Sequence, residues 1–391
     1  MKIVHIITRL ILGGAQENTL VTCKLLADRG HDVTLITGPA LGPEGQLFDR
    51  ALKENYKTIV LDKMRRAIIP PYDLITYLQL KHILKKLKPD IVHTHSAKAG
   101  ILGRYAGYAL KGAFDDPEKP HVVHTIHGLA FHEYLSKRKN DFYIAIENAT
   151  AKRTDAFITV ADTMTQKALA VGMGTADMYT TAWSAIEEDT YLTPPTPTEI
   201  ADFRRKYGIS DQATVLVTIA RLAELKGHAY IIESAKHLAE KHPDCVWLFV
   251  GDGELTQDIK SDIQMLGLQY KFKFTGLIDP SKIPLAIHSS DILVHCSLRE
   301  GLARALPQAM LCAKPVISFD IDGAKEVVND TTGRLIQAED VTALTEACRE
   351  LIENPQLRKT LGQNGKASVT KRFAPDTMVD TIEGVYNKLM Q

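Results

Sequence analysis

The feature that most constrains this chain of 391 residues is a repeated order of short apolar stretches and longer stretches with helical spacing. Residues 2–8 have the composition of a strand, residues 15–28 carry apolar side chains at helical spacing, and residues 33–37 are again strand-like. The same order begins a second time at residue 213. Because two parallel strands need a crossover between them, usually a helix, the pattern predicts an α/β architecture with parallel sheets.

The clearest signal for a domain boundary is a group of prolines within residues 192–197, which follows an acidic turn at residues 187–189. Prolines grouped in this way are typical of linkers. We therefore expect two Rossmann-like parallel-sheet domains, residues 1–192 and 193–374, which face a central cleft. The amphipathic segment 375–391 is expected to form a helix that crosses back onto the first domain.

Composition and charge exclude several classes of function. The chain carries 47 basic and 47 acidic side chains, so its net charge does not indicate a nucleic-acid partner. No apolar run reaches the ~20 residues of a membrane-spanning helix, and no secretory signal precedes the first strand. The five cysteines are odd in number and never spaced as C-x-x-C, which predicts reduced core thiols in a cytoplasmic protein.

Residues 296–317 contain the most informative polar side chains. Glu300 follows an apolar strand and precedes Gly301, so we expect it on a loop that leads into a helix. The backbone N–H groups of Gly301, Leu302 and their neighbours would then be unpaired and face a ligand. Gln308 lies eight positions after Glu300, just over two helical turns, so both side chains would face one groove. This arrangement suits a sugar phosphate, and the alternative is a capped helix with a solvated glutamate.

Two cations, Arg221 and Lys226, lie on the loop between the first strand and the first helix of the second half. A guanidinium fork and an ammonium beside a helix N-terminus suit a diphosphate ligand. The alternative is a surface loop whose two cations are solvated.

Gly13 and Gly14 precede the first helix and would allow a ligand to approach the backbone closely. A dinucleotide-binding fold is the obvious alternative, but its G-x-G-x-x-G pattern is absent and no acid ends the second strand. A glycine turn with a purely structural role remains open.

Four histidines, His93, His95, His124 and His127, lie at or near the carboxyl ends of two predicted strands, where open α/β sheets bind ligands. His93 and His95 share one face of a strand, whereas His124 and His127 do not, and no carboxylate accompanies them. We therefore expect no metal site. His127 is better interpreted as a hydrogen-bond donor to a hydroxyl or phosphate, or as a residue that holds its loop by bonding to backbone.

Residues 63–88 combine basic side chains with an apolar helical stripe. A basic amphipathic surface can contact anionic lipid, which would bring a cytoplasmic protein to the inner face of the membrane. The alternative is a solvated helix face.

Taken together, these residues resemble those of family-4 retaining glycosyltransferases of the GT-B type, over nearly the whole chain. The matching stretches are residues 13–16, 124–128, 251–253, 274–276 and 300–316, together with Arg221 and Lys226. The last stretch is the most specific, because the family carries two glutamates separated by seven residues. Here the second glutamate is replaced by Gln308, which can accept and donate hydrogen bonds but carries no charge.

The resemblance implies a role for each of these side chains. Glu300 would approach the donor sugar, and Gln308 would bond the ribose hydroxyls. Arg221 and Lys226 would bind the diphosphate, and His127 would line the transfer site. The implied catalytic residues are therefore Glu300, His127, Arg221 and Lys226.

The implied donor site is larger than the catalytic set. The loop of Gly13 and Gly14 would close against donor and acceptor. The residues that we expect to bind the donor are Gly13, Gly14, Arg221, Lys226, Gly253, Gly276, Glu300, Gly301, Leu302, Ala303 and Gln308.

The implied reaction moves a hexosyl or N-acetylhexosaminyl group from a nucleoside-diphosphate sugar, expected to be UDP-linked, to a hydroxyl of a glycan, a lipid-linked molecule or a small molecule, as in polysaccharide biosynthesis. Negative charge builds on the leaving diphosphate, so fixed cations and N–H groups would stabilise the transition state. We therefore expect neither a cofactor nor a divalent metal. Asp320 and Asp322 match the metal-binding D-x-D of another glycosyltransferase fold, and we interpret this match as chance.

Two other functions remain open from the sequence. A nucleotide-sugar epimerase could use the same two-domain scaffold, although Arg221 and Lys226 suit a leaving diphosphate better. The second is a catalytically impaired nucleotide-sugar-binding homologue, with Gln308 as the sign of lost activity.

Overall fold

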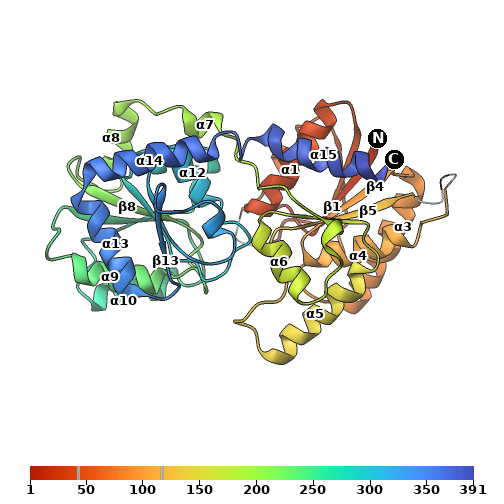
Figure 1. The fold of residues 1–391 in the computed structure, drawn as a ribbon, viewed down its shortest axis with the longest axis horizontal. Coiled ribbons are helices and arrows are strands. Elements are labelled where there is room, and N and C mark those ends of the chain that lie inside the picture. The colour runs from red at the N-terminus through yellow and green to blue at the C-terminus, as the bar shows by residue number, and fades with distance from the viewer. Residues whose placement is uncertain (42–44, 115, 117–118) are drawn as a thin grey trace. The chain divides into compact units, whose positions relative to one another are not determined.

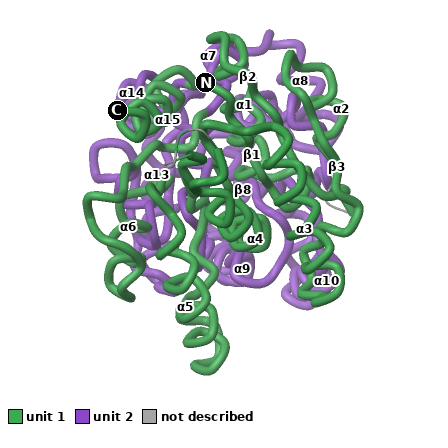
Figure 2. Tube along the Cα trace, turned by 90° about the vertical axis from the view of Figure 1, so that its right-hand side faces the viewer, with its two compact units in different colours: residues 1–185, 375–391 green, residues 186–374 purple. Residues whose placement is uncertain are grey.

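A computed structural model of the chain describes residues 1–41, 45–114, 116 and 119–391 (Figure 1). The chain forms two compact units, which Figure 2 colours separately. Unit 1 comprises Met1–Ala185 and Pro375–Gln391, and unit 2 comprises Ile186–Ala374. Each unit contains a parallel sheet with helices packed on it, which confirms the predicted α/β architecture of two Rossmann-like sheets.

The sheet of unit 1 has the strand order β3-β2-β1-β4-β5-β6-β7 among the residues described. Its strands are β1 (Lys2–Ile7), β2 (Asp32–Thr37), β3 (Lys57–Val60), β4 (Ile91–His95), β5 (His121–Ile126), β6 (Ala156–Thr159) and β7 (Tyr179–Thr181). The chain runs outward from β1 to β3 and then returns to β4 on the other side of β1. Open α/β sheets bind ligands at the carboxyl ends of the strands beside such a reversal.

Two layers of helices cover the sheet of unit 1. The helices are α1 (Gly14–Asp28), α2 (Phe48–Ala51), α3 (Pro70–Leu87), α4 (Ala97–Tyr108), α5 (Lys137–Ala151), α6 (Asp162–Ala170), the 3₁₀ turn η1 (Ala176–Met178) and α15 (Pro375–Leu389). Ile3 and Ile91 pack with Tyr386 on the face covered by α1 and α15. Ile6 and Leu80 belong to the cluster on the other face, under α3 and α4. Alternate strand residues therefore serve separate cores, as the pleat of a strand requires.

The C-terminal helix α15 belongs to unit 1 and lies beside α1, far from it in sequence (Figure 1). Its Glu383 accepts hydrogen bonds from Arg29 (2.9 Å) and pairs with His31 (2.9 Å). Tyr386 on the same helix is fully buried. The last helix thus completes the core of the first unit.

Unit 2 has a sheet with the strand order β10-β9-β8-β11-β12-β13. Its strands are β8 (Thr214–Ile219), β9 (Cys245–Val250), β10 (Phe272–Gly276), β11 (Ile292–His295), β12 (Val316–Phe319) and β13 (Gly333–Ile336). Its helices are α7 (Asp189–Leu192), α8 (Pro197–Lys206), α9 (His228–Leu238), α10 (Thr256–Met265), η2 (Pro280–Lys282), α11 (Ile283–His288), α12 (Ala305–Leu311), η3 (Ala324–Glu326), α13 (Val341–Glu353) and α14 (Pro355–Val369). Trp247 and Phe249 on β9 are both buried in one hydrophobic core of this unit.

The proline-rich stretch that we expected to link the domains lies inside unit 2. The backbone carbonyl of Tyr191 accepts hydrogen bonds from His288 Nε2 (3.0 Å) and from Cys312 Sγ (3.5 Å), and these bonds hold α7 against the second unit. The chain therefore divides between Ala185 and Ile186 rather than at residue 192, because α7 packs before the prolines are reached.

Two further expectations concern the thiols and membrane-spanning segments. All five cysteines are buried and none forms a disulfide, as expected of core thiols. Among the helices described, none combines the length and the apolar composition that crossing a bilayer would need.

Candidate functional site

Loops of unit 2 that follow β8, β9 and β11 pack closely at the carboxyl end of the sheet, and glycines allow this approach. Gly227 has a φ of +72°, and a Cβ at this position would lie 1.8 Å from the carbonyl oxygen of Cys296. A Cβ on Gly253 would lie 2.2 Å from the carbonyl oxygen of Leu222. Only glycine permits such contact between backbones, so Gly253, an expected donor-binding residue, has a structural role as well.

Leu225 adopts an uncommon backbone conformation, with a φ of +62°. Its carbonyl oxygen accepts hydrogen bonds from Ser297 Oγ (3.1 Å) and from the Leu298 N–H (2.8 Å). These two bonds hold the strained residue and bring its neighbour Lys226 next to the loop that carries Glu300.

The carboxylate of Glu300 is the centre of this site. Its Oε1 lies 2.5 Å from Lys226 Nζ, accepts a hydrogen bond from Ser297 Oγ (2.8 Å) and lies 3.6 Å from His295 Nε2. Burial acts to raise the pKa of Glu300, but the Lys226 ammonium and His295 outweigh it and hold the pKa well below its ordinary value. Glu300 is therefore an anion at neutral pH and a very weak base.

The helix that we expected directly after Glu300 begins later, at Ala305. The intervening loop is held by the segment that follows β12. The Glu300 N–H donates to Asp322 Oδ2 (2.7 Å), and the Gly323 N–H donates to the Gly301 carbonyl (3.2 Å). These tertiary hydrogen bonds take the place of helical ones.

Gln308 lies inside α12, half-buried, and its backbone N–H donates to the Arg304 carbonyl (3.1 Å). Glu300 lies on the loop before that helix, as expected, so the helical spacing of eight positions does not by itself bring the two side chains together, and their facing one groove stays a prediction. Within the part of the chain that the structure describes, the Gln308 side-chain amide bonds to no protein group, so it stays a candidate ligand contact.

Three consecutive backbone N–H groups beside Glu300 have no acceptor among the residues described, those of Gly301, Leu302 and Ala303. All three residues are buried, and Leu302 and Ala303 are only 7% and 6% exposed. Buried N–H groups in proteins are nearly always paired. This row of donors therefore indicates a ligand with acceptor oxygens next to the Lys226–Glu300 pair.

Arg221 lies on the same loop as Lys226, and its side chain is exposed. No described residue forms an ion pair with it, so its guanidinium can turn towards a ligand. Gly276 ends β10 with a φ of +66°, and its carbonyl accepts a hydrogen bond from the Gly251 N–H (3.2 Å). That contact gives Gly276 a structural role at the same edge of the sheet.

The other predicted site residues, Gly13, Gly14 and His127, belong to unit 1. Gly14 begins α1, and Gly13 has an extended backbone with a φ of 174°, which any residue can adopt. A Cβ on Gly13 would meet only the end of the flexible Gln16 side chain, 2.7 Å from its Oε1. The fold of unit 1 therefore does not by itself require glycine at position 13, which leaves close approach by a ligand as a reason for it.

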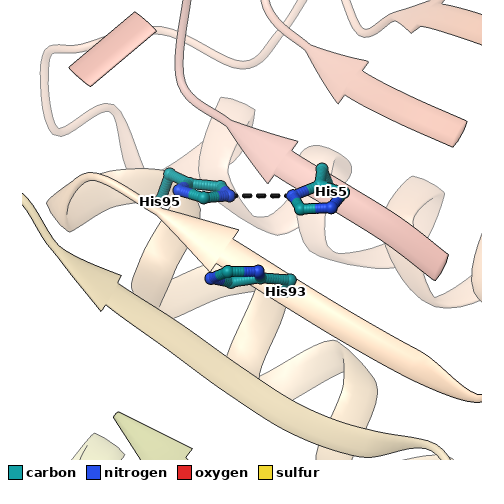
Figure 3. Close-up of side chains that lie close together, drawn as sticks. All are labelled: His5, His93 and His95. Atoms are coloured by element: carbon teal, nitrogen blue, oxygen red, sulfur yellow. Dashed lines mark hydrogen bonds between the residues drawn. The ribbon is translucent and has the colours of Figure 1, made fainter. Parts of the chain in front are cut away.

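His127 follows β5 and contacts a cluster of three histidines, His5, His93 and His95, which Figure 3 shows. Its Nε2 lies 3.1 Å from His95 Nδ1, and His95 Nε2 lies 3.0 Å from Nδ1 of His5, a residue that we did not single out from the sequence. Burial lowers the pKa of His5 to about 3 and the pKa values of His93 and His95 well below the ordinary range. These buried imidazoles are therefore neutral at pH 7.

The same cluster contains a candidate metal-binding group, because His5, His93 and His95 offer nitrogens within 4.8 Å of one another. However, His93 Nδ1 lies 2.5 Å from Tyr386 Oη, and its Nε2 lies 2.6 Å from Thr125 Oγ1. Both nitrogens of His93 thus already have hydroxyl partners, so hydrogen bonds account for the arrangement better than a metal does.

Three partners of Glu300 were missed by the sequence-based reasoning: His295, Ser297 and Asp322. Ser297 was recognisable in principle, because it precedes Glu300 by three residues on the same loop. Asp322 belongs to the D-x-D match that we interpreted as chance, and in the structure it holds the Glu300 backbone. Its contribution depends on two loops meeting in space, which local sequence does not reveal.

Solved structures share this pair of units. A glycosyltransferase from Rickettsia africae matches with a TM-score of 0.81 and 20% sequence identity, over 100% of this chain and 98% of its own. Anabaena HepE in complex with UDP and glucose matches with a TM-score of 0.81 and 21% identity, over 99% of both chains. The fold is therefore that of the GT-B class of glycosyltransferases, as predicted.

Sequence comparison identifies the family. Residues 12–178 match Glycosyltransferase Family 4, and residues 199–368 match Glycosyl transferases group 1. The UDP-Gal:alpha-D-GlcNAc-diphosphoundecaprenol alpha-1,3-galactosyltransferase of Escherichia coli is 30% identical, over 99% of this chain and 96% of its own length. The N-acetyl-alpha-D-glucosaminyl L-malate synthase of Bacillus anthracis is 23% identical, over 94% and 92%. The chain therefore belongs to glycosyltransferase family 4.

The buried histidines predict how the stability of unit 1 depends on pH. Burial keeps His5, His93, His95 and His124 neutral in the folded state, whereas each binds a proton in the unfolded chain below pH ~6.5. Since the unfolded state binds more protons, stability falls as the pH falls below that value, by roughly 1.4 kcal/mol per pH unit for each histidine. For His5 this loss continues to about pH 3.

Urea unfolding between pH 7 and pH 5, followed by Trp183 fluorescence in a Trp247→Phe variant, measures this dependence in unit 1. His124→Asn should lower the slope of the unfolding free energy against pH, because about one proton fewer is bound on unfolding. The exposed His82→Gln should leave it unchanged. Equal stability at pH 7 and pH 5 would show that these histidines are charged in the folded state.

Proposed function

We propose that this protein is a retaining, metal-independent glycosyltransferase that moves a hexosyl group from a UDP-sugar to a hydroxyl of a lipid-linked glycan. The observation that carries the proposal is the Lys226–Glu300 pair, joined at 2.5 Å, beside the three buried N–H groups of residues 301–303. An anion and a set of donors lie side by side there, as a ligand with sugar hydroxyls and a diphosphate would require.

The leaving group is the diphosphate. As the bond from the sugar C1 to the diphosphate oxygen breaks, negative charge grows on that oxygen, and the N–H groups of residues 301–303 and the guanidinium of Arg221 stabilise it. The Lys226 ammonium has three N–H donors, so it can bond both Glu300 and a phosphate oxygen. These fixed cations neutralise the charge of the diphosphate, as a divalent metal does in other sites. We therefore propose that the reaction needs no metal.

Glu300 acts as a fixed anion rather than as a base. Lys226 and His295 hold its pKa too low for it to remove a proton from an acceptor hydroxyl. It instead accepts hydrogen bonds from the donor sugar and stabilises positive charge on the ring. In the retaining scheme the acceptor oxygen bonds to C1 on the face that the diphosphate leaves, and the acceptor proton passes to the departing diphosphate oxygen.

The choice of donor and acceptor is supported by relatives. The Escherichia coli relative is a UDP-galactose-dependent transferase that acts on a GlcNAc-diphosphoundecaprenol. HepE has been solved with UDP-glucose and, separately, with UDP. For this chain we therefore propose a UDP-hexose donor and a sugar hydroxyl on a lipid-linked diphosphate.

Replacing the central carboxylate tests the function. Glu300→Gln should lower kcat by about 100-fold or more, because it removes the anion but keeps the side-chain shape. The assay follows transfer from UDP-galactose, UDP-glucose and UDP-N-acetylglucosamine to a lipid-linked GlcNAc, with and without EDTA, and equal turnover is expected in both. Glu233→Gln on the surface of α9 is the matched control.

Unchanged turnover in Glu300→Gln would contradict the proposed role of this residue. Incubation with the UDP-sugar alone separates the alternatives. An epimerised nucleotide sugar would favour an epimerase, and binding without any turnover would favour an impaired homologue.

Nucleotide binding tests whether the exposed guanidinium of Arg221 contacts the diphosphate. Arg221→Ala should raise the Kd for UDP by about tenfold, because a charge-assisted hydrogen bond to the diphosphate is lost. Calorimetry with UDP and with uridine shows whether Arg221 contacts the diphosphate. Uridine lacks a diphosphate, so its affinity should not change in the variant. Arg205→Ala, which removes a surface arginine that pairs with Asp202, should bind UDP as the unchanged protein does.

A lipid-linked acceptor implies contact with a membrane, and one helix face of unit 1 suits that contact. Leu74 and Leu78 on α3 are 60% and 55% exposed, and Ile75 is 40% exposed. Lys85 and Lys86 are exposed at the C-terminal end of the same helix. We call these five residues the α3 face. Exposed apolar side chains beside cations fit a bilayer of anionic lipid.

Vesicle binding tests the α3 face. The protein should sediment with phosphatidylglycerol vesicles and much less with phosphatidylcholine vesicles, because the cations need anionic lipid. Leu74→Ser with Leu78→Ser should reduce sedimentation several-fold. Met265→Ser with Leu266→Ser, which removes exposed apolar side chains of unit 2, is the control. Equal sedimentation of the two double variants would exclude the α3 face as the contact.

A further inference from the structure

An arginine of unit 1, Arg65, lies between β3 and α3 and has no acceptor within the described parts of the protein. Its side chain is half-buried, and its Nη1 is shielded from solvent without a hydrogen-bond partner. Within the ranges that the structure describes, this guanidinium forms no ion pair either. A cation that has lost part of its water and gained no acceptor is costly, so Arg65 is a candidate contact for a ligand with acceptor oxygens.

Two other arginines of unit 1 show the usual arrangement of such a side chain. Arg104 is buried and donates to Glu147 Oε2 (2.7 Å). Arg29 is half-buried and donates to Glu383 Oε2 (2.9 Å). In both, a carboxylate of the same unit neutralises the guanidinium and links two elements. Arg65 has no such carboxylate among the described residues, which indicates that it does not serve the fold in this way.

The segment that carries Arg65 is anchored on both sides. Met64 is buried, and a Cβ on Gly38 would lie 2.1 Å from the Met64 carbonyl oxygen, so the two backbones touch. On the other side, Lys98 Nζ donates to the Ala67 carbonyl (2.8 Å). Arg65 therefore lies on a short stretch of backbone whose two ends are held.

These contacts place the segment at the carboxyl end of the unit 1 sheet. Gly38 follows β2, and its N–H donates to the carbonyl of Thr8, which follows β1 (3.1 Å). Lys98 lies in the first turn of α4, which follows β4. The strand order reverses between β1 and β4, and open α/β sheets bind ligands beside such a reversal.

The charge at this edge favours an anion. Residues 61–67 contain three cations and one acid, Asp62. The N–H groups of Ala97 and Lys98, in the first turn of α4, have no acceptor in the described ranges. A helix N-terminus carries partial positive charge and suits phosphate groups. The fork of an arginine adds a bidentate contact to two phosphate oxygens, which a lysine cannot make.

Exposed apolar side chains follow the cation along the chain. Ile68 lies three residues after Arg65 and is 66% exposed. α3 begins at Pro70, and Leu74 and Leu78 of the α3 face are exposed as well. Apolar side chains beside a cation suit a molecule in which a phosphate is joined to a hydrocarbon chain.

We propose that Arg65 binds the diphosphate of a lipid-linked acceptor, whose hydrocarbon chain lies along Ile68 and the α3 face. The proposal rests on the proposed function and adds to it a recognition site for the acceptor in unit 1. The guanidinium recognises the phosphate, whereas the apolar side chains accept any long chain. A bilayer phospholipid offers the same chemistry, and kinetics without phospholipid separates the two sources.

Kinetics in detergent tests which part of the acceptor Arg65 contacts. Arg65→Ala should raise the KM for a GlcNAc joined through a diphosphate to a ten-carbon prenyl chain by about tenfold, because a charge-assisted bidentate contact is lost. The KM for the UDP-sugar and kcat should stay within about twofold. A GlcNAc glycoside with the same chain and no phosphate should show the same KM in both proteins. Arg65→Lys keeps the charge without the fork and should give an intermediate KM.

The neighbouring Arg66→Ala, which removes an exposed arginine, is the matched control and should leave the acceptor KM within about twofold. Equal rises in the two variants would indicate a general attraction of charge and overturn the specific contact. An effect of Arg65→Ala that is confined to sedimentation with phosphatidylglycerol vesicles would assign the residue to bilayer phospholipid and overturn the proposal as well.

Binding without turnover separates this proposal from the proposed function. Calorimetry with geranyl diphosphate in excess UDP should show about tenfold weaker binding in Arg65→Ala and unchanged binding in Arg66→Ala. That result, together with no sugar transfer by the unaltered protein, would refute the proposed function and leave the site in unit 1 established. Sugar transfer with an unchanged acceptor KM in Arg65→Ala would refute the site and leave the proposed function standing.

Discussion

The ion pair between Lys226 and Glu300 is the interaction on which the site of unit 2 depends. It joins two loops that follow different strands, and each loop needs special backbone to reach the other. Gly227 lets the first loop touch the Cys296 carbonyl, and Leu225 accepts a left-handed conformation that hydrogen bonds to the second loop hold. Backbone strain in the scaffold is thereby used to bring a cation to a carboxylate, an arrangement found at sites that bind charged ligands.

The same pair decides the chemistry that the site can perform. A carboxylate beside an ammonium stays ionised, so Glu300 contributes charge and hydrogen-bond acceptors but no proton transfer. The buried N–H groups of residues 301–303 add hydrogen-bond donors that carry no formal charge.

Much of the fold was predictable because it follows from local patterns. The alternation of apolar strands and helix-spaced segments is set by the period of each element, and it led to the correct parallel α/β class. The domain boundary was less accurate, because prolines indicate where a helix cannot continue and do not show which unit a segment packs on. The helix after Glu300 was placed too early, because tertiary contacts decide where it begins. The Glu300 N–H donates to the Asp322 carboxylate and the Gly301 carbonyl accepts from the Gly323 N–H, and both partners are distant in sequence.

By itself, the sequence determined the α/β class, the two sheets and the chemical types of the site residues, since these depend on periodicity and on which side chains are present. Tertiary structure alone decided which of those side chains interact. Three contacts join strands or loops that are far apart in the chain: the pairing of Lys226 with Glu300, the support from Asp322 and the hydrogen bond between His5 and His95. Such contacts depend on strand order and register, and the energy of a buried polar group depends on its partner in space rather than on its neighbours in sequence.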